Sequence, residues 1–179
     1  MTALGGEVVS VERLRHPAPA EADKELRLAQ KARMRGDLLE TVEHLDRAIA
    51  FYPGFTEAHI ELGAVRLQQG QIENALAALE RAAAINSTSL AARLNLAVVQ
   101  LQADRLPSAE NTARQAVALD PRSPRAHYLL AVTLERQGNR EAAAAELRAY
   151  LEMDGLAYRT TAKNWLIAVE SPSTPRENN

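Results

Sequence analysis

The sequence predicts an all-α protein made of stacked helix pairs, and three observations support this prediction. The first is an unbroken 34-residue register in which a large residue precedes a small one, at Leu28-Ala29, Leu62-Gly63, Leu96-Ala97 and Leu130-Ala131. The second is the spacing of apolar residues by three and four positions within each unit, which is helical rather than strand-like. The third is the recurrence of helix-breaking residues at fixed places. A period between about 20 and 50 residues indicates a stacked repeat array.

Each unit is expected to contain two helices joined by a short turn. The first helix should end at a recurring position, which is occupied by Gly36, Gly70, Asp104 and Gly138. Glycine suits this position because it adopts positive φ without a steric penalty. The second helices of the first and third units are expected to stop at Pro53 and Pro121. Small residues between the paired helices should let their backbones approach closely.

The register gives the chain a resemblance to the tetratricopeptide repeat (TPR) family, whose 34-residue pattern carries Leu-Gly, Ala, a large apolar residue, Ala and Pro. Residues 56–89 form the best copy, with Leu62-Gly63, Gly70, Ala75, Leu79 and Ala82 in place. The resemblance implies a right-handed α-α superhelix, or solenoid. It divides residues 22–157 into four repeats, at 22–55, 56–89, 90–123 and 124–157.

The two ends of the chain differ from the repeats. Residues 158–170 are predicted to form a capping helix in which Trp165 packs over the last repeat, and 171–179 have the composition of a disordered tail. Residues 1–21 are expected to be a leader or linker that includes a β-prone run at 6–14. Three interpretations of that run stay open: a flexible leader, the stump of an upstream β-domain, or an extended segment that folds back onto the chain's own groove.

Composition excludes several classes of function. The formal net charge is −2 and the basic residues are scattered, so we expect no nucleic-acid partner. The chain has no cysteine, and no apolar run approaches the roughly 18 residues of a membrane helix. We therefore expect no direct membrane insertion. A cytoplasmic location is favoured if Met1 is the true start, and an extracytoplasmic one stays open if an upstream domain or signal is missing. The Ala- and Arg-rich composition has a bacterial character.

The sequence offers little catalytic chemistry. His59 and His127 occupy the same register position two repeats apart, which places them on the order of 20 Å from each other, too far to share a metal. We interpret both as structural, and we expect His44 to be exposed on an outer helix. No phosphate loop, nucleophile elbow or His-x-x-x-His pair is present. The prediction is a non-enzyme without catalytic residues, cofactor or metal.

The resemblance implies instead a concave groove lined by the first helix of each repeat. Carried over position by position, its lining is Leu26, Gln30, Arg33, Ile60, Ala64, Leu67, Leu94, Asn95, Val98, Leu101, Arg125, Tyr128, Val132 and Arg136. The apolar majority predicts a protein partner of unknown identity that presents an apolar or amphipathic segment. One branch of the family binds the acidic tail of its partner through lysines and asparagines on successive first helices. At the corresponding positions of this chain, only Asn95 is a suitable residue. Two alternatives are a self-associating scaffold and the regulatory or interaction portion of a larger multidomain bacterial protein, exported or not.

Overall fold

A computed structural model of the chain describes residues 18–153 and 159–170, and that part of the chain contains helices and no strand. The helices are α2 (Ala20–Met34), α3 (Leu38–Phe51), α4 (Thr56–Gln68), α5 (Ile72–Ile85), α6 (Leu90–Gln102), α7 (Leu106–Leu119), α8 (Pro124–Arg136), α9 (Arg140–Leu151) and α10 (Arg159–Glu170). The all-α prediction is confirmed. Residues 1–17 and 171–179 lie outside the described residues, so the predictions for the 6–14 run and the tail stay predictions.

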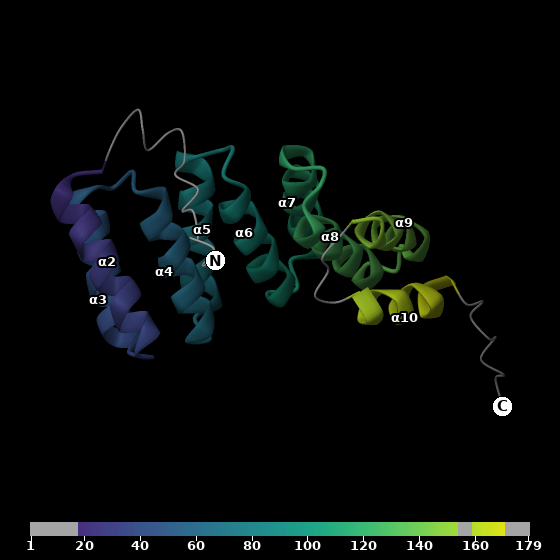
Figure 1. The fold of residues 1–179 in the computed structure, drawn as a ribbon, viewed down its shortest axis with the longest axis horizontal. Coiled ribbons are helices and arrows are strands. Elements are labelled where there is room, and N and C mark those ends of the chain that lie inside the picture. Colours follow the sequence, from purple (N-terminus) through teal and green to yellow (C-terminus); the bar gives the residue numbers. More distant parts are fainter. Residues whose placement is uncertain (1–17, 154–158, 171–179) are drawn as a thin grey trace, which may run out of the picture.

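The helices stack as successive pairs in a curved row, from α2 and α3 at one end to α8 and α9 at the other (Figure 1). Each second helix packs against the first helix of its own repeat and against that of the next repeat. The first helices also meet directly, since α4 contacts α6 and α6 contacts α8. This arrangement makes one layer of first helices and one layer of second helices, as the superhelical fold class predicts.

The turn inside each repeat follows from its backbone. Gly36, Gly70 and Gly138 adopt φ values of 80°, 73° and 82°, and Asp104 adopts 57° at the same register position. The left-handed conformation lets the chain reverse directly after the first helix. In the first repeat the next helix then begins at once, because the side chain of Asp37 accepts a hydrogen bond from the backbone N–H of Glu40.

The last repeat is covered by α10. Trp165 packs edge-on to Tyr128, with ring centroids 5.8 Å apart, and Tyr128 lies 5.7 Å from Tyr150. These aromatic contacts place α10 on the apolar face that the fourth repeat leaves open. Arg140 then donates hydrogen bonds to the carbonyl oxygen of Val169 at 2.9 and 3.2 Å, which satisfies a carbonyl at the end of α10.

Gln100 is a buried polar residue on α6, and replacing it with leucine is expected to stabilise the fold. Its side chain lies among residues that exclude water, is 7% exposed, and its Oε1 accepts no hydrogen bond from the described residues. Leu134 fills the same register position in the fourth repeat at 1% exposure. An unsatisfied buried acceptor costs about 1–3 kcal/mol, so Gln100→Leu should raise the free energy of unfolding by about 1 kcal/mol in urea denaturation.

The matched control for this prediction is Gln102→Leu, an exposed position on the same helix. Its free energy of unfolding should change by no more than about 0.5 kcal/mol. A loss of stability in Gln100→Leu alone would mean that the Gln100 amide contributes more through polar contacts than leucine regains through burial.

Candidate functional site

All fourteen predicted groove residues lie on the first helices of the four repeats. α2 carries three of them, α4 three, α6 four and α8 four. Because α4, α6 and α8 pack side by side, and Gln30 and Arg33 of α2 contact Glu61 of α4, the structure gathers these positions on one layer of the molecule (Figure 1). The position of a residue in this layer does not by itself make its side chain accessible, so burial separates the fourteen into three groups.

Arg33, Ala64, Arg125 and Arg136 are exposed. A second group is half-buried and consists of Gln30, Ile60, Leu67, Asn95, Val98, Leu101, Tyr128 and Val132. Leu26 and Leu94 are 4% and 7% exposed. Leu26 belongs to the core of the first two repeats and Leu94 to the core between the third and fourth. These two side chains therefore offer little surface to a partner.

A polar contact joins the first two repeats along this layer. Gln30 Nε2 donates a hydrogen bond to Glu61 Oε1 at 2.9 Å, and Arg33 Nε lies 3.4 Å from Glu61 Oε2. The Glu61 side chain is 20% exposed, so its charge lies partly out of water and Arg33 provides the compensating charge. Glu61 is absent from the predicted groove residues, although it occupies the same register position as Asn95 one repeat earlier.

Polar contacts also join the third and fourth repeats. Arg125 donates to Asn95 Oδ1 at 2.9 Å. Arg136 donates to the carbonyl oxygen of Leu101 at 2.6 Å and pairs with Asp104 at 2.9 Å. Exposed pairs of this kind contribute about 0–1 kcal/mol each. Although they add little stability, these contacts hold the arginine head groups against the array and so fix the shape of this surface.

The same layer carries an apolar strip, which we define as Ile60, Leu67, Val98, Leu101 and Val132. Its members come from α4, α6 and α8 and are all half-buried. Tyr128 adjoins the strip on α8, where its ring already packs against Trp165 and Tyr150. A half-buried apolar surface that crosses three helices loses water on contact with another apolar surface, and this is favourable. The arrangement is suited to binding and provides no reacting group.

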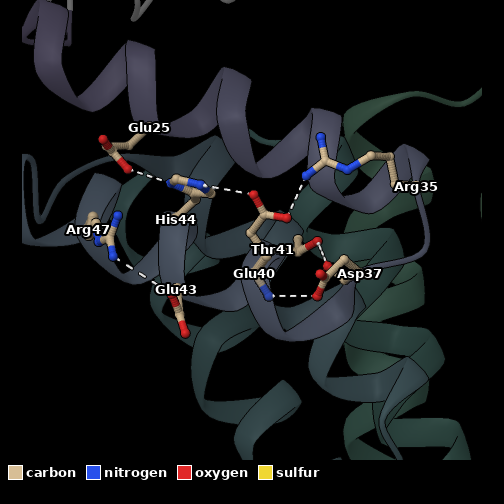
Figure 2. A network of polar contacts seen from close by, with 8 residues as sticks. All are labelled: Glu25, Arg35, Asp37, Glu40, Thr41, Glu43, His44 and Arg47. Carbon is tan, nitrogen blue, oxygen red and sulfur yellow. Dashed lines mark hydrogen bonds and ion pairs between the residues drawn. The ribbon is translucent and has the colours of Figure 1, made fainter.

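His44 and His127 each contact a glutamate on the other helix of their own repeat. His44 on α3 lies 2.7 Å from Glu25 on α2 and 3.7 Å from Glu40 (Figure 2). Its side chain is 13% exposed, so the expectation of an exposed His44 is wrong, because Glu25 and the neighbouring helix cover it. In the described part of the chain, no group of three or more His, Asp or Glu side chains is placed to hold a metal ion. None of the described helices combines the length and the apolar composition that a bilayer span requires.

A family model described as tetratricopeptide repeat matches residues 26–90 and 94–158, and a second of the same description matches 66–115. The first model alone covers more than half of the chain. The chain belongs to the tetratricopeptide repeat family. A TPR array is in general a protein–protein interaction module, and its repeats are typically non-catalytic. No curated protein sequence matches the chain.

Solved structures share the fold at low identity. MamA from residue 41 to its end, from Desulfovibrio magneticus RS-1, is 17% identical, with coverage of 85% of this chain and 94% of that one and a TM-score of 0.72. A TPR protein from Parabacteroides merdae ATCC 43184 is 17% identical over 84% and 60%, with a TM-score of 0.75. A thermophilic TPR protein of Thermus thermophilus is 20% identical over 82% and 81%, with a TM-score of 0.68. These similarities support the TPR superhelix as the fold.

Proposed function

We propose that this TPR protein is a non-catalytic interaction module whose concave groove binds an apolar or amphipathic segment of a partner protein. The observation that supports the proposal is the apolar strip, whose five half-buried members come from α4, α6 and α8. Adjacent packed helices are about 8–10 Å apart, so the strip extends for about 20 Å. An amphipathic helix of about 13 residues has the same length at 1.5 Å per residue.

The charged residues beside the strip favour an apolar ligand over an acidic tail. Arg33, Arg125 and Arg136 each contact a polar group of a neighbouring repeat. A carboxylate ligand would have to compete with those contacts, whereas an apolar segment can cover the strip and leave them in place. Asn95 accepts a hydrogen bond from Arg125 through Oδ1, which leaves the amide nitrogen to donate to a backbone carbonyl of the ligand.

A peptide-display selection on the purified full chain tests this proposal. Counter-selection uses a double variant, Ile60→Glu with Val98→Glu, which places two charges in the middle of the strip. Peptides that enrich on the wild-type chain should be apolar or amphipathic and should be lost on the variant. Enrichment of equal strength on both proteins would place binding elsewhere and contradict the groove assignment.

Self-association is the second candidate function, and exposed apolar side chains of the first repeat favour it. Met34 is 86% exposed, Leu39 76% and Phe51 54%. Met34 and Leu39 flank the turn between α2 and α3, whereas Phe51 lies at the other end of α3. Exposed large apolar side chains can mark contact sites. Light scattering over a range of concentrations distinguishes this function: a mass that rises with concentration, and that returns to the monomer value in Leu39→Lys, supports it. A constant monomer mass excludes it.

A further inference from the structure

A cleft of about 390 Å³ opens between α3 and α5, the second helices of the first two repeats, with α4 as its floor. It is lined by Asp46 and Ile49 of α3, by His59, Leu62 and Arg66 of α4, and by Asn74, Ala77, Ala78 and Arg81 of α5. None of these residues belongs to the apolar strip or to the predicted groove. The cleft therefore lies apart from the proposed peptide site.

Comparison with the fourth repeat shows that this cleft lacks a glutamate beside its histidine. In the fourth repeat, His127 Nδ1 lies 2.6 Å from Glu146 Oε2. His59 occupies the position of His127 in the second repeat, but Ala78 stands where the fourth repeat has Glu146. The first repeat has the same pair reversed, with Glu25 in the position of His59 and His44 in that of Ala78 (Figure 2).

His59 uses one ring nitrogen in a hydrogen bond and leaves the other available for a further one. The residue is 8% exposed, and its Nε2 lies 3.0 Å from the carbonyl oxygen of Pro53, as His127 Nε2 lies 3.1 Å from that of Pro121. A carbonyl oxygen only accepts, so Nε2 carries the proton and donates. Nδ1 of His59 has no hydrogen-bond partner among the described residues. A ring nitrogen of this buried residue, on the wall of an open cleft, is thus unpaired, whereas its counterpart in the fourth repeat is paired with a carboxylate.

The charges around the cleft are unevenly distributed. Arg81 is exposed and forms no ion pair with any described residue. Arg66 donates to the amide oxygens of Gln69 and Gln71, which are uncharged. Asp46 is the one carboxylate on the cleft wall. Two guanidinium groups against one carboxylate leave a net positive charge, so an anionic group entering the cleft is attracted.

We propose that this cleft binds a carboxylate, supplied by an aspartate or glutamate side chain of a partner protein, with His59 Nδ1 and Arg81 as the groups that receive it. The Glu146 contact with His127 shows that the same histidine position in the repeat accepts a carboxylate at hydrogen-bond distance. The cleft opens on the outer surface between α3 and α5, where its lining residues Asp46, Asn74 and Arg81 are exposed. A carboxylate side chain on the surface of a partner protein can therefore reach it.

Binding at this site is coupled to a proton. Burial, the largest cause, and the charge of Arg81 lower the pKa of His59, while the Pro53 carbonyl raises it. Near neutral pH the ring is therefore neutral, and its Nδ1 carries a lone pair. A carboxylate needs an N–H at Nδ1, so its arrival brings a proton to the ring and raises the pKa of His59. The charged groups facing the ring are Asp46 from α3, Arg66 from α4 and Arg81 from α5.

The test uses N-acetylglutamate α-amide as a probe for a glutamate side chain, added to the full chain with ¹⁵N-labelled histidine. Long-range ¹H–¹⁵N NMR reports protonation at Nδ1 of His59. At pH 6 the probe should move the Nδ1 signal toward its protonated position. In Arg81→Gln the apparent affinity for the probe should fall by about tenfold, because the charge-assisted hydrogen bond is lost. The N-acetylglutamine amide should have no effect, and Asp46→Asn should strengthen binding.

Other outcomes overturn the assignment. An unchanged Nδ1 signal at saturating probe, or a response that is the same in Arg81→Gln, contradicts the site. A response to inorganic phosphate without one to the glutamate probe replaces a carboxylate site with a phosphate site. The probe contains no apolar segment, so a negative probe titration does not test the groove proposal. A negative peptide selection, in turn, does not test the carboxylate site.

A built-in carboxylate provides the second test and a stability prediction. Ala78→Glu should recreate the pair of the fourth repeat and close the cleft to the probe. In the wild-type chain the lowered pKa of His59 means that the unfolded state binds more protons, so stability falls as the pH drops through about 6.5. In Ala78→Glu the pKa of His59 is raised instead, so the added stability is present below about pH 6.5 and is lost as the pH rises through the folded-state pKa.

The measurement is the melting temperature of each variant at pH 6 and pH 8. Ala84→Glu is the matched control, since it adds the same charge to an exposed position of α5 that does not line the cleft. The melting temperature of Ala78→Glu relative to this control should be higher at pH 6 than at pH 8. The reverse order, or equal values, would show that a carboxylate at this position does not reach His59.

Discussion

Replacing Ile60 and Val98 by glutamate is expected to weaken binding of a groove ligand by about a hundredfold or more, while the helical content stays near that of the wild type. Both side chains are half-buried at the surface of the first-helix layer, so the new carboxylates can still reach water in the free protein. In the complex they would be covered by an apolar ligand and left unpaired. Burying an unpaired charge costs several kcal/mol, and about 2.7 kcal/mol corresponds to a hundredfold.

The control for this prediction places the same charges outside the groove. Ala84→Glu with Ala118→Glu changes exposed positions on the second helices α5 and α7. Its affinity for a selected peptide, measured by calorimetry, should stay within about twofold of wild type. A double variant in the strip that keeps its affinity would exclude the strip as the contact surface.

Gly63→Ala is expected to destabilise the array, although alanine is the better helix former. A Cβ atom at Gly63 would lie 2.5 Å from Leu79 Cγ and 3.0 Å from both of its methyl carbons. Leu79 is fully buried, so its branch point has nowhere to move. Overpacking of this kind costs about 1–3 kcal/mol, which outweighs the roughly 1 kcal/mol that alanine gains in helix propensity. We expect a net loss of about 1 kcal/mol in urea denaturation.

The third repeat supplies the compensating change. Ala97 and Ala113 occupy there the positions of Gly63 and Leu79, and both are fully buried. Leu79→Ala alone should cost about 2–5 kcal/mol, but combined with Gly63→Ala it should cost less than the two single effects together, with a coupling energy of about 1 kcal/mol or more. Additive single effects would mean that α4 and α5 move apart to accept the methyl group.

The fold could be predicted from the sequence because every repeat carries the same local information. The turn positions show this best, since Gly36, Gly70 and Gly138 all adopt the positive φ that their place after the first helix implies. Asp104 adopts it as well, although the residue type alone does not require it. In both cases the register determines the backbone.

Accessibility in the groove could not be predicted from the register. Leu26, Ile60, Leu94 and Tyr128 share one position, yet Leu26 and Leu94 are buried and the other two are half-buried. The difference arises between repeats, where the size of neighbouring side chains decides how closely helices pack. Leu94 lies in the same core cluster as residues of α8, which a pattern within one repeat does not reveal. Substitutions at Leu94 would therefore test stability rather than binding.

The register also does not reveal which polar side chains contact one another. Glu61 contacts Gln30 and Arg33 of the preceding repeat, and Glu25 covers His44 across two helices. Each pair joins residues at different register positions on different helices. Only the three-dimensional stacking brings them together.

The most direct test of the groove assignment is methyl NMR of the full chain, titrated with a peptide from the selection. Ile60 is the one isoleucine of the predicted groove, while Ile85 and Ile167 lie on α5 and α10 outside it. Saturating peptide should shift the methyl signals of Ile60, Val98 and Val132 and leave those of Ile85 and Ile167 in place. Shifts confined to Ile85 or Ile167, with an unchanged Ile60, would contradict binding in the groove.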